Sequence, residues 1–238
     1  MGISPVLLVL LALAAYLLGS VPGAYLAARW CQGIDIRQYG SGNVGLANLW
    51  RLAPRWLAVL VFIFDLAKGM VMVWVAREIG LSISEQVIVG VAAIVGHNWP
   101  VFLGFSGGRG ILTTLGVVFI LMPWGIAVLL AIASLSIPLK STPLPVLAGI
   151  AALPIASWAF GEPLPIILGF LIILLIVIIR RLTARQITIA PTDKKQLILN
   201  RLLFDRDIRD KEAWLHRVPP EASSSKQPAG QQEKQGKG

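Results

Sequence analysis

Long apolar runs separated by short polar connections constrain the fold of this chain more than any other feature. A helix that crosses a membrane needs about 20 mostly apolar residues, and runs of this kind cover residues 5–30, 52–75, 86–100, 111–122, 124–139, 144–160 and 164–179. With 56% hydrophobic and only 14% charged residues, the chain is too apolar for a soluble domain. The sequence predicts an all-α integral membrane protein with about seven transmembrane helices.

The composition changes near residue 190. Residues 1–190 are predicted to form one multi-span domain, and residues 191–238 a cytoplasmic tail. Within the tail, residues 193–217 combine charges with apolar side chains at spacings near three and four, which is typical of an amphipathic helix on a membrane surface. Residues 221–238 are rich in Ser, Gln, Gly and Lys and are predicted to be disordered.

The distribution of basic residues predicts the orientation of the domain. One set of connections holds most of the arginines, whereas the other set holds Arg77 together with three glutamates. Since basic loops stay in the cytoplasm, the sequence predicts an outside N-terminus, a cytoplasmic C-terminus and both glycine-rich loops on the cytoplasmic face. The protein is therefore expected to be a multi-pass protein of a bacterial cell membrane with a site that faces the cytoplasm.

The net charge of +9 is explained by membrane orientation and by anionic lipid headgroups, so no nucleic acid partner is expected. A single cysteine excludes an internal disulfide. The two histidines are too far apart in sequence to suggest a metal pair. We therefore expect no metal and no cofactor, and the sequence leaves protein partners open.

The loop of residues 96–110 is the first candidate site. Its second half, from Ser106 to Gly110, is rich in glycine and leads into an apolar helix, an arrangement that seats phosphate on backbone N–H groups. Arg109 adds a planar set of donors that suits a phosphate. His97 could orient a phosphate or assist proton transfer. The alternatives are a flexible loop on the basic side of the membrane and a purely structural histidine.

The loop of residues 31–55 is the second candidate. Its glycines allow tight turns, its uncharged polar side chains offer hydrogen bonds, and its arginine could hold an anion; the residues concerned are Gly40, Ser41, Asn43, Gly45, Asn48 and Arg51. The alternative interpretation is a short surface or re-entrant turn capped by Asn and Ser.

Asp65 and Lys68 lie near the middle of an apolar run, where ionisable groups are costly and usually find partners inside the bundle. Their spacing of three allows them to meet on one helix face. An internal ion pair that serves packing and a role in the site are equally consistent with this pattern.

Three stretches resemble the bacterial acyl-phosphate:glycerol-3-phosphate acyltransferases, the PlsY family. Residues 40–51, GSGNVGLANLWR, and residues 96–105, GHNWPVFLGF, resemble the first and second motifs of that family. Residues 64–69, FDLAKG, resemble a further stretch, and the likeness runs in order from about residue 19 to residue 181.

The resemblance implies an enzyme that moves an acyl group from acyl phosphate to glycerol 3-phosphate, forming lysophosphatidic acid in phospholipid biosynthesis without a metal or another cofactor. Membrane lipids would surround it. The residues implied as catalytic are His97, Ser41 and Arg51. Those implied in substrate binding are Gly40, Asn43, Gly45, Asn48, Lys68, Ser106, Gly107, Gly108, Arg109, Gly110, Ser141, Thr142 and Arg181.

The chain also departs from the family's pattern. Ser106 and Arg109 stand where lysines are usual, and Arg181 stands where the last span usually carries a histidine. A basic side chain such as Arg181 or Arg185, if it points toward Arg109 and Arg51, would replace the charge lost at Ser106. Two alternatives remain open: a non-catalytic relative that binds phospholipid precursors, and a transporter of an anionic solute.

Overall fold

The computed structural model describes residues 4–184 and 193–215, and within these ranges every regular element is a helix. In chain order the elements are α1 (Pro5–Ser20), α2 (Gly23–Gln32), η1 (Ile36–Gln38), α3 (Leu46–Leu52), α4 (Arg55–Glu78), α5 (Ile83–Asn98), η2 (Val101–Leu103), α6 (Ile111–Leu121), α7 (Gly125–Ala133), α8 (Ser136–Leu139), α9 (Pro143–Ala159), α10 (Leu164–Leu182), α11 (Lys194–Phe204) and α12 (Lys211–Leu215). The prediction of an all-α protein is confirmed for the described residues.

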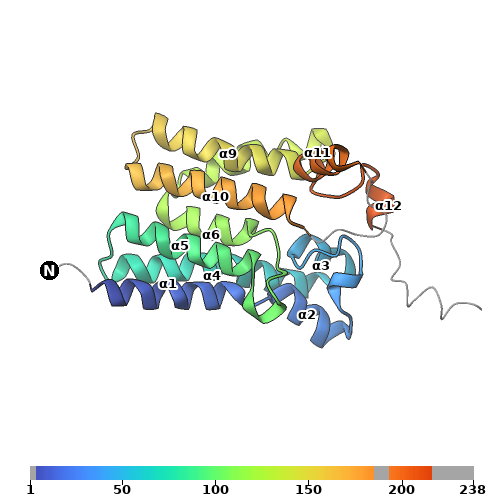
Figure 1. Cartoon of the computed structure of the whole chain (residues 1–238), viewed down its shortest axis with the longest axis horizontal. Helices are drawn as coiled ribbons and strands as arrows, with labels where there is room; N and C mark the ends of the chain where they lie inside the picture. Colours follow the sequence, from blue (N-terminus) through green and yellow to red (C-terminus); the bar gives the residue numbers. More distant parts are fainter. Residues whose placement is uncertain (1–3, 185–192, 216–238) are drawn as a thin grey trace, which may run out of the picture.

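Four helical segments are long and apolar enough to cross a membrane: Pro5–Gln32, Arg55–Glu78, Ile83–Leu103 and Leu164–Leu182. Three shorter apolar segments, Ile111–Leu121, Gly125–Leu139 and Pro143–Ala159, complete the bundle. The predicted apolar runs therefore match the helices to within a few residues. Figure 1 shows the long helices running side by side, with the start of α1 at one end and α3 and α11 at the other.

The first apolar segment is broken at Val21 and Pro22, which separate α1 from α2. Proline has no N–H group and interrupts a helix, so a break at this position is expected. The carbonyl of Val21 accepts a hydrogen bond from the Lys68 ammonium at 3.3 Å. A side chain of α4 therefore ties the broken segment to the bundle.

Close helix crossings at glycines hold the bundle together. A Cβ atom on Gly96 of α5 would lie 2.1 Å from the carbonyl oxygen of Tyr16, and one on Gly19 of α1 would lie 2.2 Å from that of Ala93. Gly69 and Gly116 make the same reciprocal approach between α4 and α6. Small residues allow helices to approach closely in membranes, and these two crossings fix the positions of α4 and α5, which carry part of the site.

The main apolar core lies between α4, α5, α6, α9 and α10. Its buried residues include Val73, Ile94, Val117, Leu153 and Phe170. Large hydrophobic side chains on the outer faces, such as those on α1 and α10, are exposed. That distribution suits a bundle surrounded by lipid, where apolar side chains face outward as well as inward.

The tail differs from its prediction in one respect. Over the described residues 193–215, the predicted single helix is two helices, because α11 ends at Phe204 and the next residue, Asp205, has a left-handed backbone with φ +54°. In addition, α11 packs against α9 and α10, and its predicted position on the membrane surface stays a prediction. Arg181 donates to the carbonyl of Leu202 at 2.8 Å, so hydrogen bonds dock α11 on the bundle. Residues 221–238, predicted to be disordered, lie outside the described residues.

Candidate functional site

A cavity of about 350 Å³ opens at the end of the bundle that carries α3 and α11. Residues from the loop before α3, from α4 to α6, from the start of α9, from the end of α10 and from the tail line it. The polar lining residues are Asn43, Asp65, His97, Arg109, Thr142, Arg181 and Asp205, and the larger apolar ones are Leu46, Trp50, Ile111, Leu112 and Val146. The two glycine-rich loops, the connection before α9 and the end of α10 therefore meet at one cavity.

The glycine-rich loop after η2 contacts α5 through His97 and α10 through Arg180. A Cβ atom on Gly108 would lie 2.2 Å from Nε2 of His97, so only glycine fits there without a shift. The buried Arg180 guanidinium donates to the carbonyl of Gly107 at 2.6 Å and to that of Gly108 at 3.0 Å. These hydrogen bonds tie the loop to α10, and its next residues, Arg109 and Gly110, line the large cavity.

Arg109 reaches the cavity from this loop with two of its three guanidinium nitrogens engaged. Its Nε lies 2.8 Å from Oδ1 of Asp205, and its Nη1 donates to the carbonyl of Arg180 at 3.0 Å. Arg181 also lines the cavity and donates to the carbonyls of Leu202 and Pro143. Two arginines therefore contribute positive charge to one cavity.

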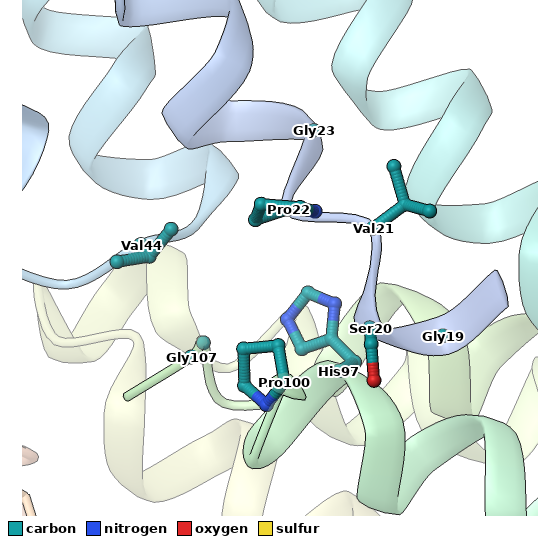
Figure 2. Close-up of a pocket in the computed structure, with 10 residues that line it drawn as sticks. Gly19, Ser20, Val21, Pro22, Gly23, Val44, His97, Pro100 and Gly107 are labelled. Atoms are coloured by element: carbon teal, nitrogen blue, oxygen red, sulfur yellow. The ribbon is translucent and has the colours of Figure 1, made fainter. Parts of the chain in front are cut away.

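His97 stands between the large cavity and a smaller one of about 10 Å³, which has room for about one water molecule. Figure 2 shows its ring below the break between α1 and α2, beside Pro100 and Gly107. Its Nδ1 lies 3.7 Å from Oδ1 of Asp65, which in turn lies 2.8 Å from the Lys68 ammonium. Both members of this ion pair are almost fully buried. The interpretation of Lys68 as part of an internal ion pair is the one that this geometry favours.

The loop before α3 is organised by Asn48. Its side-chain amide donates to the carbonyls of Ile36, Tyr39 and Asn43, and its Oδ1 accepts from the N–H of Ser41 at 3.0 Å. With all these groups engaged by backbone, Asn48 shapes the loop, and Asn43 and Gly45 are the loop residues that reach the cavity.

Asp35 and Arg37 brace the start of the same loop. The Arg37 guanidinium contacts the Asp35 carboxylate at 2.6 Å. This hydrogen-bonded pair holds the pKa of Asp35 below its ordinary value, because a carboxylate that accepts charged donors keeps its negative form. The brace therefore remains charged at neutral pH.

The structure brings seven of the predicted site residues to the large cavity: Asn43, Gly45, His97, Arg109, Gly110, Thr142 and Arg181. Gly107 and Gly108 line the smaller cavity with His97. The other predicted site residues lie in the surrounding helices and loops: Gly40, Ser41, Asn48, Arg51, Lys68, Ser106 and Ser141. Among them, Arg51 and Ser106 are exposed, whereas Asn48 and Lys68 are buried. Arg185 lies outside the described residues.

Three residues near the site were not among the predicted catalytic and substrate-binding residues, although the sequence left a site role open for Asp65. Asp65 lines the cavity, Arg180 anchors the glycine-rich loop, and Asp205 pairs with Arg109. The intramembrane position of Asp65 was a usable signal. For Arg180, the sequence offered two adjacent arginines without indicating which one faces the loop. For Asp205, a charged residue in an amphipathic segment carried no such signal.

Known proteins share this fold and sequence. A family model described as glycerol-3-phosphate acyltransferase matches residues 9–188. Glycerol-3-phosphate acyltransferase 5 of Dehalococcoides mccartyi is 44% identical over 224 residues, which cover 91% of this chain and 96% of the relative. A glycerol-3-phosphate acyltransferase of Laribacter hongkongensis is 39% identical over 175 residues, which cover 70% of this chain and 85% of the relative.

Two solved structures are also similar. The glycerol 3-phosphate form of PlsY, an integral membrane glycerol 3-phosphate acyltransferase, has 31% identity and a TM-score of 0.68 over 73% of this chain and 88% of PlsY. The lysophosphatidic acid form of PlsY has 28% identity and a TM-score of 0.68 over 88% of this chain and 99% of PlsY. With a matching family model, relatives of nearly equal extent and the same helical architecture, this chain belongs to the glycerol-3-phosphate acyltransferase family.

Proposed function

We propose that the protein transfers a fatty acyl group from acyl phosphate to the sn-1 hydroxyl of glycerol 3-phosphate in the large cavity, giving lysophosphatidic acid and inorganic phosphate. Acylation of glycerol 3-phosphate follows from the family, whose solved members bind glycerol 3-phosphate and lysophosphatidic acid. The observation that carries the proposal is the cavity itself, in which two arginines stand next to an apolar wall.

Both proposed substrates carry a phosphate group, and the donor also carries an acyl chain. Arg109 and Arg181 supply cationic donors for phosphate, and Leu46, Ile111 and Val146 supply apolar surface for the chain. A volume of about 350 Å³ lies in the range of ordinary ligand pockets, roughly 300–1,000 Å³. Holding both substrates in one cavity converts a bimolecular reaction into one between neighbours.

The proposed reaction needs no enzyme nucleophile, because phosphate is a good leaving group. The glycerol hydroxyl oxygen forms a bond with the acyl carbonyl carbon, the bond from that carbon to the phosphate oxygen breaks, and phosphate departs. His97 accepts the hydroxyl proton and returns it to the departing phosphate, while Asp65, 3.7 Å away, stabilises the protonated ring. Ser41 lies two residues before the lining residue Asn43, and Arg51 directly follows the lining residue Trp50. Both stay predicted substrate contacts.

Purified protein in detergent is expected to release phosphate and lysophosphatidic acid from acyl phosphate and glycerol 3-phosphate. Arg109→Ala should lower kcat/KM by about 10- to 100-fold, the loss expected when a charged hydrogen-bond donor is removed. The matched control is Arg77→Ala, which removes an exposed arginine from the C-terminal end of α4, away from the cavity. This variant should leave kcat/KM unchanged.

The outcomes of this assay separate the proposed functions. A wild-type protein without turnover would contradict acyl transfer. If that protein were nevertheless stabilised against heat by glycerol 3-phosphate, it would be a binding relative. Uptake of glycerol 3-phosphate into proteoliposomes would instead indicate a transporter.

The same proposal includes the topology. The four long and three shorter apolar segments would make seven spans in a bacterial cell membrane, with the N-terminus outside and the cavity facing the cytoplasm. The support is the positive-inside rule: the cavity end carries Arg29, Arg37, Arg51, Arg55, Arg109, Lys140, Arg180 and Arg181, whereas the opposite connections carry Arg77 with Glu78, Glu85 and Glu162.

Cys31 provides a native probe of this topology, because it is exposed at the end of α2. A membrane-impermeant maleimide is expected to label Cys31 in inside-out vesicles and to leave it unlabelled in intact cells. The control places the only cysteine at the other end of the bundle, in the double variant Cys31→Ser/Glu78→Cys, and should reverse the pattern. Labelling of Cys31 from outside intact cells would overturn the proposed orientation.

A further inference from the structure

Asp205 is a tail residue that lines the large cavity. It follows the last residue of α11, outside residues 9–188 that the family model matches. Oδ1 and Oδ2 lie 2.8 Å and 3.1 Å from Nε of Arg109, which is 96 residues away in the sequence. The tail therefore contacts Arg109, the arginine of the glycine-rich loop.

Several hydrogen bonds fix the tail segment that carries Asp205. Arg181 and Arg201 make reciprocal contacts, since Arg181 donates to the carbonyl of Leu202 and Arg201 donates to that of Leu182. Arg201 also pairs with the buried Asp207 at 2.7 Å. The backbone N–H of Asp205 itself donates to the carbonyl of Arg201 at 3.1 Å. The backbone around Asp205 is therefore fixed, and its carboxylate contacts Arg109.

The backbone conformation of Asp205 indicates that its side chain has a role. With φ +54°, the residue occupies the left-handed region, where glycine is the residue of lowest strain and where asparagine and aspartate are tolerated. A carboxylate beside a seat for anions also opposes phosphate electrostatically. Both costs are accounted for if the carboxylate orients Arg109.

The contacts of Arg109 show what such orientation would achieve. Asp205 engages Nε and the carbonyl of Arg180 engages Nη1, so among the described residues Nη2 has no hydrogen-bond partner and can donate to a ligand. Resting on the proposed function, we propose that Asp205 is a positioning residue that holds the Arg109 guanidinium in the orientation that receives the phosphate of glycerol 3-phosphate. It acts through Arg109, and its buried Oδ1 does not contact the substrate.

Two variants test this inference without disturbing the turn, because both residues accept a positive φ: Asp205→Gly and Asp205→Asn. Each is expected to raise KM for glycerol 3-phosphate about tenfold, since small misplacements of a binding group are costly, with a smaller change in kcat. Thermal unfolding midpoints in detergent should match that of the wild type. Asp205→Glu, which keeps the charge, should recover part of the affinity.

The matched control is Asp193→Asn, which removes a carboxylate from the opposite end of α11, where it caps the helix, and should leave KM unchanged. An unchanged KM in Asp205→Gly would overturn the inference, and so would a lowered KM, which would mean that the carboxylate merely competes with phosphate. Protection of the wild type and Asp205→Gly from thermal unfolding by glycerol 3-phosphate gives the same comparison without turnover. A wild type that binds but does not turn over would therefore reject the proposed function alone.

Discussion

Replacing Arg180 by alanine is expected to lower kcat/KM for acyl transfer by about 100-fold, because the loop that carries Arg109 would lose its anchor. The Arg180 guanidinium holds the carbonyls of Gly107 and Gly108 at 2.6 Å and 3.0 Å. Without it, two buried carbonyl oxygens lose charged donors, at a cost of about 1–3 kcal/mol each. The loop would then relax away from the cavity, and steady-state kinetics in detergent would measure the loss.

Arg180→Lys separates the effect of geometry from that of charge. A lysine keeps the positive charge, but its compact ammonium lacks the planar set of donors that reaches both carbonyls. We expect kcat/KM of this variant to lie between those of the wild type and Arg180→Ala. Full activity in Arg180→Lys would show that charge alone matters, and full activity in Arg180→Ala would refute the anchoring role. Arg77→Ala remains the control for loss of an arginine.

The largest effect on stability is expected from separating Asp65 and Lys68. The pair meets at 2.8 Å with side chains 2% and 1% exposed, so either single variant leaves a buried charge without its partner. Breaking a buried ion pair in this way costs about 3–5 kcal/mol. Asp65→Leu and Lys68→Met should each lower the free energy of unfolding by that amount, as measured by denaturant unfolding in detergent.

The double variant Asp65→Leu/Lys68→Met completes the test. Replacing both members of a buried pair by apolar residues is often neutral for stability, so the double variant should recover most of the loss, and a double-mutant cycle measures the coupling. Additive losses would contradict the ion pair. Activity should stay low in the double variant even if stability returns, because Asp65 lies next to His97 and lines the cavity.

The order of the helices could be predicted from composition, because each apolar run is a local property of about 15 to 25 residues. Pro22 was a visible signal for the break in the first span. The glycine-rich loop and Arg109 were also visible, since a glycine-rich turn with an arginine at the start of an apolar helix is an arrangement that seats anions. The role of Asn48 in the loop could not be predicted: its polar side chain suggested substrate binding, and only the structure shows that it bonds to four backbone groups.

The sequence by itself therefore determined a helical membrane protein, the two glycine-rich loops that line the large cavity and the family resemblance, because these depend on short stretches of chain. Only the tertiary structure decided that Arg180 anchors the loop while Arg181 faces the cavity, and that Asp205 pairs with Arg109. Neighbouring residues on a helix point about 100° apart, and helix packing sets which of them faces inward. The pairing of Arg109 with Asp205 joins residues 96 positions apart, a distance that no local pattern encodes.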